Sequence, residues 1–265
     1  MDIQISCSSF YFSSSRSCAI LAIAWLTCCA SPITAFSLPT SMSPSAPPLL
    51  SVQDFKSGLQ GQRGLVLDID ETLSWTVGFW MERMQKLFGN PEKLSVKDMA
   101  DKYHLTQNVP YWQTDEAHAW MQSMRDKPEA QEELPVIEGA LEGVKALQED
   151  GVALLGYLTV RPQSVVSSTR KWLLAQGFPD LPIVAKPDDV SFSNGNKWKG
   201  EALRFLYPEV WGIVDDNPKV PLEAGSSYEG TVFLFAHDAC KEGYEHAIPC
   251  KTWKEVVEEV KKRRK

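Results

Sequence analysis

Apolar segments of four to nine residues alternate with amphipathic helical segments from residue 64 onward, and this alternation limits the possible folds more than any other feature of the sequence. Near-continuous apolar strands joined by helices favour a parallel sheet that is covered by helices on both faces. The fold class predicted is therefore α/β, with a Rossmann-like parallel sheet sandwiched by helices. The predicted strands are 64–69, 152–160, 182–185, 211–216 and 231–236, and the predicted core helices are 138–151, 164–177 and 200–207.

Polar residues follow these strands at their carboxyl ends, where ligands bind in open α/β sheets. One hydroxyl, lysine amines and four acids should therefore meet at one edge of the sheet. A structural core alone gives no reason for such a bias. The residues are Asp68 and Asp70 after the first strand, Thr159 and Arg161 after the second, Asp215, Asp216 and Asn217 after the fourth, and Lys197 and Lys199 before a helix.

The acids at this edge need a cation, because like charges repel one another and are costly to remove from water. Hard oxygen ligands favour Mg²⁺ over softer metals. The sequence therefore predicts Mg²⁺ as the cofactor.

Four segments carry the resemblance to a known family, in the order "LVLDIDET", "LLGYLT", "NKWKGEAL" and "GIVDD". Together they resemble the motifs of the haloacid dehalogenase (HAD) superfamily of phosphohydrolases, over residues 64 to about 240. The resemblance implies a HAD-like core and a phosphatase that hydrolyses a phosphate monoester.

The resemblance also implies roles for the residues in these motifs. Asp68 would attack phosphorus and form an aspartyl phosphate. Asp70 would protonate the leaving oxygen and then activate water, and its backbone carbonyl would face the metal. Thr159 and Lys199 would bind the phosphoryl oxygens, with Lys197 as the alternative lysine.

Asp215 and Asp216 would complete the magnesium site together with Asp68 and Asp70. Two residues keep two interpretations each. Arg161 is a candidate for binding substrate phosphate or the leaving group, but could equally pair with a nearby acid. Asn217 would reach a metal-bound water or cap the segment that follows.

Residues 75–136 separate the first motif from the helix that leads to the second strand, and the resemblance identifies such an insertion as a small, mainly helical cap over the active site. Its tryptophans are expected to form the cap's own core. A short cap favours a small phosphorylated metabolite as substrate. The core domain is predicted to span residues 51–265.

Residues 1–50 differ in composition from the rest of the chain. "CAILAIAWLTCCA" has the length of a signal-peptide core and is short for a membrane span, and a Ser/Pro-rich, acid-poor stretch follows it. The combination resembles the two-part leaders of plastid proteins in algae with secondary plastids. Secretion, or delivery to the endomembrane lumen by a signal peptide, is the alternative. No stable membrane insertion is expected after the leader is removed.

The net charge of the chain limits the classes of partner that it can be expected to bind. A formal charge of −7 and a pI of about 5.2 argue against a nucleic-acid partner.

Cys240 and Cys250, the cysteines left after leader removal, form one bridge or two separate thiols. A phosphotransferase or phosphomutase of the same fold and a catalytically silent binding protein remain as alternative functions, and the sequence leaves the oligomeric state open.

Overall fold

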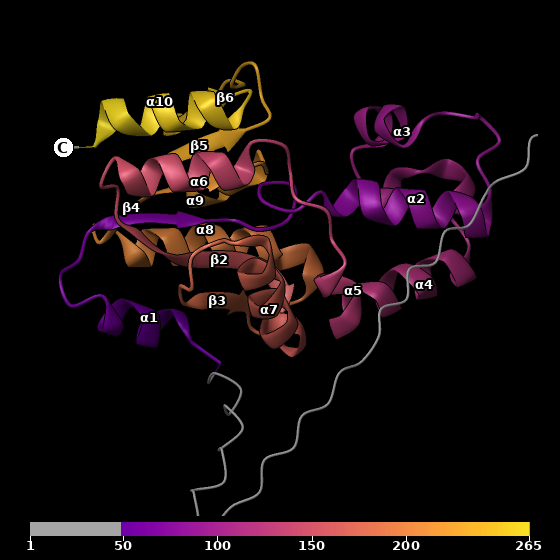
Figure 1. Ribbon diagram of the computed structural model, residues 1–265, viewed down its shortest axis with the longest axis horizontal. Helices are drawn as coiled ribbons and strands as arrows, with labels where there is room; N and C mark the ends of the chain where they lie inside the picture. Colours follow the sequence, from indigo (N-terminus) through magenta and orange to yellow (C-terminus); the bar gives the residue numbers. More distant parts are fainter. Residues whose placement is uncertain (1–48, 265) are drawn as a thin grey trace, which may run out of the picture. The chain divides into compact units, whose positions relative to one another are not determined.

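The computed structural model describes residues 49–264, so the predicted leader, and the localisation that depends on it, lie outside the described residues. Six parallel strands form one sheet in the order β3-β2-β1-β4-β5-β6 (Figure 1). The central strand β1 is buried along its whole length. The strands are β1 (Gly64–Leu67), β2 (Leu154–Pro162), β3 (Ile183–Lys186), β4 (Val210–Asp215), β5 (Thr231–Phe235) and β6 (Ala247–Cys250).

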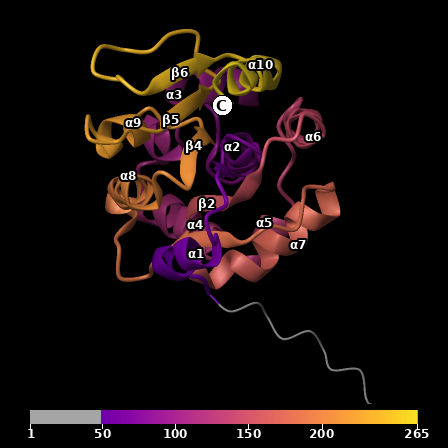
Figure 2. The same ribbon diagram turned by 90° about the vertical axis from the view of Figure 1, so that its left-hand side faces the viewer.

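Helices cover both faces of this sheet, as Figure 2 shows. Alternate residues of a strand point to opposite faces, so Leu65 and Leu67 pack in one apolar cluster and Val66 packs in the other. The first cluster contains residues of α6 (Ala140–Glu149), α7 (Val166–Gln176) and α10 (Trp253–Arg263), and the second contains residues of α1 (Val52–Gly58), α8 (Gly195–Leu206) and α9 (Lys219–Ala224). The predicted Rossmann-like α/β fold is confirmed.

One predicted helix boundary is wrong in a way that bears on the site. Helix α8 begins at Gly195 rather than at Gly200, so Gly200 lies inside the helix. A side chain at Gly200 would meet the backbone of Glu223 and Ala224 at 2.5–2.8 Å. Gly200 therefore allows α8 and α9 to approach closely, instead of opening the helix.

The segment between β1 and β2 contains α2 (Thr76–Phe88), α3 (Val96–Tyr103), α4 (Asp115–Arg125) and α5 (Pro128–Glu132), with short 3₁₀ turns at Thr106–Asn108 and Pro110–Trp112. Two backbone hydrogen bonds join the start of this segment to its end. Trp75 N donates to Pro135 O, and Ile137 N donates to Leu73 O, both at 2.8 Å. The fully buried Trp112 packs among these helices and donates from its indole to Gly89 O. Whether the segment acts as a separate cap domain stays a prediction.

The cysteines and the membrane expectation can be compared with the described residues. Cys240 and Cys250 are both free thiols, and Cys250 is buried. No helix within residues 49–264 combines the length and the apolar character that a membrane crossing requires.

Candidate active site

The loop after β1 places the first two acids. Leu73 N and Ser74 N both donate to Ile69 O, at 2.8 and 2.9 Å, so the chain makes a tight turn directly behind Asp70. Glu71 has a φ of 55°, in the left-handed region that few non-glycine residues adopt. Strained backbone of this kind gathers at functional sites, and here it returns the chain towards β1.

Lys199 joins the first and fourth motifs. Its Nζ donates to Asp68 Oδ1 at 2.7 Å and to Asp215 Oδ2 at 2.8 Å, and the side chains of all three residues are almost fully buried. Lys197 is exposed to solvent. The structure therefore brings Lys199, and not Lys197, into contact with the predicted nucleophile.

Burial and like charge dominate the electrostatics of this cluster. Burial raises the pKa of Asp68 to about 7, against the lowering effect of the Lys199 ammonium. Burial, with the charges of Asp215 and Asp68, also raises the pKa of Asp216 well above its usual range. Burial would lower the pKa of Lys199, but the two carboxylates that it contacts raise it, so Lys199 stays a cation. Three acids thus face one fixed positive charge.

Asp68, Asp215 and Asp216 fit a divalent cation. One oxygen from each lies within 4.8 Å of the others, and the surplus of negative charge over Lys199 is what a hard cation would neutralise. Asn217, by contrast, forms hydrogen bonds that stabilise the loop in which it lies. Its backbone N–H donates to Asp215 Oδ1 at 2.8 Å, and its own side chain accepts from Lys219 N at 3.0 Å.

Three further residues hold the acids in place and were given no role from the sequence. Thr72 Oγ1 accepts a hydrogen bond from Asp216 N at 3.1 Å, which ties the first motif to the fourth. Trp253 Nε1, on α10, donates to Thr72 O at 3.0 Å, and His237 Nε2 lies 2.9 Å from Asp216 O. The last helix therefore supports the loop that carries the site. Thr72 belongs to a quoted motif, whereas the sequence around His237 and Trp253 offers no signal for these contacts.

Asp70 lies beside this cluster, paired with Arg161. The guanidinium contacts both carboxylate oxygens, with Nε 2.9 Å from Oδ2 and Nη2 2.7 Å from Oδ1. Thr76, at the start of α2, donates to Oδ1 at 2.5 Å. Burial would raise the pKa of Asp70, but Arg161 and Thr76 together lower it. Thr159, which is buried, accepts from Arg161 N at 3.2 Å.

A cavity of about 480 Å³ opens at the same edge of the sheet. The ends of β2 and β3, the end of α4 and the loop before α8 contribute its lining. The residues are Arg125, Asp126, Val160, Pro162, Ser164, Lys186, Asp188, Val190, Ser191 and Phe192.

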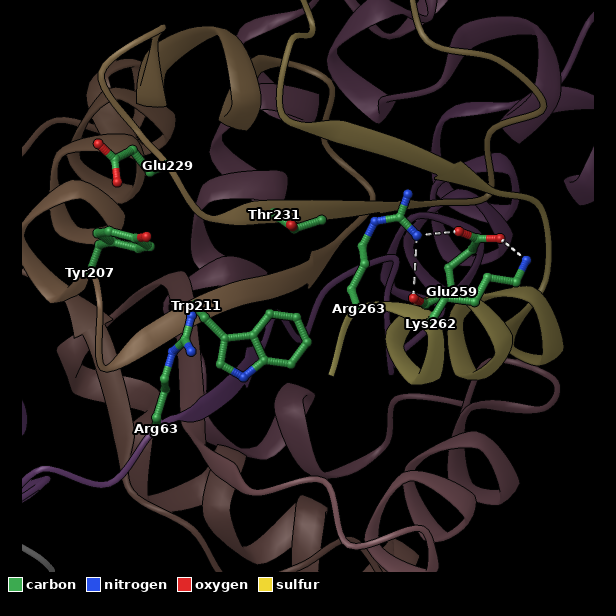
Figure 3. Close-up of a pocket in the computed structure, with 8 residues that line it drawn as sticks. All are labelled: Arg63, Tyr207, Trp211, Glu229, Thr231, Glu259, Lys262 and Arg263. Carbon is green, nitrogen blue, oxygen red and sulfur yellow. Dashed lines mark hydrogen bonds and ion pairs between the residues drawn. The ribbon is translucent and has the colours of Figure 1, made fainter. Parts of the chain in front are cut away.

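A larger cavity, of about 650 Å³, lies at the opposite, amino-terminal edge (Figure 3). None of the predicted site residues lines either cavity, although the smaller one opens at their edge of the sheet. The lining of the larger cavity comes from the starts of β4 and β5 and the end of α10, and consists of Arg63, Tyr207, Trp211, Glu229, Thr231, Glu259, Lys262 and Arg263.

Solved structures share this architecture. A candidate β-phosphoglucomutase from Thermotoga maritima matches with a TM-score of 0.51 and 16% identity, over 77% of this chain and 100% of that chain. A predicted phosphatase from Clostridium acetobutylicum matches with a TM-score of 0.49 and 14% identity, over 76% and 99% of the two chains. A hydrolase from Pseudomonas syringae matches with a TM-score of 0.45 and 16% identity, over 77% and 100%.

No protein-family model and no curated protein sequence matches the chain. The structural likeness therefore defines the class by fold. The six-stranded parallel sheet covered by helices on both faces gives this protein a HAD-like fold.

Proposed function

We propose that this protein is a Mg²⁺-dependent phosphatase of the HAD superfamily, which hydrolyses a phosphate monoester through an aspartyl phosphate. The observation that carries the proposal is the buried group of Asp68, Lys199 and Asp215, with Asp216 beside it. Burying charges costs free energy even when they are paired, so a buried cluster of this kind indicates a functional requirement. These four residues come from three separate motifs and meet at the edge where ligands bind.

Asp68 is the nucleophile in this proposal. Lys199 contacts its Oδ1, so Oδ2 is the oxygen that attacks phosphorus, and the bond from phosphorus to the leaving oxygen breaks as the new one forms. Lys199 offsets the charge on the phosphoryl oxygens. Thr159 has its hydroxyl proton available for the same oxygens, since its Oγ1 accepts from Arg161 N and donates to no group among the described residues.

Asp70 acts as general acid and then as general base in this proposal. Asp70 would first take up a proton from solvent and give it to the leaving oxygen. The resulting carboxylate, which is the form that Arg161 favours, would then take a proton from the water that attacks the aspartyl phosphate, which restores Asp68 and releases phosphate. Bound Mg²⁺, held by Asp68, Asp215, Asp216 and the Asp70 carbonyl, would shield the nucleophile from the negative charge of the substrate.

The proposed substrate is a small phosphorylated metabolite. The cavity beside the site has a volume of about 480 Å³, which is within the range of about 300–1,000 Å³ typical of small-molecule sites. Its lining mixes cationic, acidic and hydroxyl side chains, which suits a polar leaving group.

Phosphate release from a panel of sugar, nucleotide, glycolate and lipid-headgroup phosphates tests the proposal, with and without Mg²⁺. We expect release that requires Mg²⁺ and falls by at least about 10³-fold in Asp68→Asn, as when other enzymes lose their nucleophile. Release that persists in the variant would exclude Asp68 as nucleophile. Turnover that appears only with an added acceptor alcohol would instead indicate a phosphotransferase.

A further inference from the structure

Arg161 is buried beside Asp70, and its contacts are specific. An arginine carries five N–H donors in a fixed planar fork. Four of these are used within the protein: two on the Asp70 carboxylate, one on Ser74 Oγ at 3.1 Å and one on Thr169 Oγ1 at 3.0 Å. A substrate phosphate would find at most one free N–H on this guanidinium.

The position of Arg161 is fixed from two further elements. Strand β2 extends past Thr159 to Pro162, and its register against β3 shifts between these two residues, where Arg161 N donates to Thr159 Oγ1. Thr169, on α7, holds one arm of the fork, and Ser74, in the loop after β1, holds the other. The guanidinium is therefore held by α7 and by the loop that carries Asp70, in addition to its contacts with Asp70 itself.

We infer that Arg161 is a positioning residue, which aims the Asp70 carboxyl at the leaving oxygen and does not bind the substrate phosphate. The inference rests on the proposed function. A bidentate contact fixes both the position and the plane of a carboxylate, which a single hydrogen bond does not do. Proton transfer requires such aim, because donor and acceptor must come within hydrogen-bond reach.

Leaving-group dependence is the readout that separates this role from a structural one. The anion that leaves p-nitrophenyl phosphate is weakly basic and departs with little help from an acid. The anion from phenyl phosphate is more basic and gains more from protonation by Asp70. A residue that acts through Asp70 should therefore matter more for the second compound.

The experiment compares kcat/KM of the full chain and Arg161→Lys on both compounds, with Mg²⁺, because kcat/KM reports the steps up to departure of the leaving group and not the later hydrolysis of the aspartyl phosphate. The variant keeps the charge but loses the fork. We expect kcat/KM on phenyl phosphate to fall by about 10²-fold, the lower range for general acid catalysis, and kcat/KM on p-nitrophenyl phosphate to fall by much less. The inhibition constant of inorganic phosphate should stay unchanged. Arg170→Gln, which removes an exposed arginine of α7 paired with Asp180, is the control and should change neither reaction.

A second variant covers the case in which Arg161→Lys does not fold. Thr169→Val removes one holder of the fork without touching Asp70, and should give a smaller split in the same direction. Equal loss on both compounds in the folded variants would overturn the inference, as would a rise of the inhibition constant of phosphate. An unmodified chain that hydrolyses neither compound nor any member of the panel would remove the proposed function itself, and the role of Arg161 with it.

Discussion

The two edges of the sheet differ in how far their charged side chains are buried. At the carboxyl edge, Lys199 and its two carboxylates are buried and come from three separate parts of the chain. At the amino edge, Lys262 and Arg263 both pair with Glu259 within one helix, and both side chains are at least 40% exposed. The second arrangement forms on almost any helix surface.

Cavity volume would select the edge away from the candidate site, since the larger of the two cavities described above lies at the amino edge. Exposed ion pairs contribute little to stability and require no function. Buried charges from separate elements are costly, so their presence indicates a site. The candidate site is therefore distinguished by buried ion pairs between residues of separate elements, and not by the volume of the cavity beside it.

The largest effect on stability should come from removing the shared lysine. Lys199→Met leaves the Asp68 and Asp215 carboxylates buried without a cation, and breaking such a pair costs about 3–5 kcal/mol. We expect urea denaturation without Mg²⁺ to show a loss of this order. Lys262→Met at the amino edge is the matched control and should leave the free energy of unfolding unchanged. Equal effects of the two substitutions would end the distinction between the edges.

Magnesium should distinguish the edges next. A ligand that binds only the folded chain adds about 2.7 kcal/mol of stability when its concentration is 100 times its Kd. We expect Mg²⁺ to raise the melting temperature of the unmodified chain and to raise it much less in Asp216→Asn, which loses one carboxylate of the acid cluster. Glu229→Gln in the amino-edge cavity is the control and should keep the full shift. A full shift in Asp216→Asn would place the ion elsewhere.

Sequence patterns predicted the fold and the convergence of the motifs because each strand carries its own local signal. The sequence prediction also chose Lys199 over Lys197, although it did not use the helical spacing that supports this choice. Lys199, Leu203 and Leu206 share one face of α8 at spacings of four and three residues, and all three are buried. Reading the helix as starting at Gly200 hid that face.

Contacts between distant residues could not be predicted in the same way. Trp253 and Thr72 are 181 positions apart, and no spacing rule links an indole near the C-terminus to a carbonyl behind the first motif. The pairing of Arg161 with Asp70 was one of two interpretations that the sequence left open, and the geometry that selects it depends on Ser74 and Thr169, which the motifs do not mark.

The smallest predicted effect tests whether α10 belongs to the site. Trp253→Phe keeps the ring in the core but leaves Thr72 O without its donor, which costs about 1–3 kcal/mol for a buried acceptor. Trp172→Phe is a matched control, because Trp172 is equally buried and donates to Leu134 O at 2.7 Å. Both variants should lose similar stability in urea.

Only Trp253→Phe should also weaken Mg²⁺ binding, because Thr72 Oγ1 accepts from the backbone of Asp216 and a loosened loop would misplace that ligand. Titration of Mg²⁺ against the melting temperature of each variant measures the difference. A similar loss of Mg²⁺ affinity in both would show that general destabilisation of the core, and not the Trp253–Thr72 contact, sets the geometry of the acids.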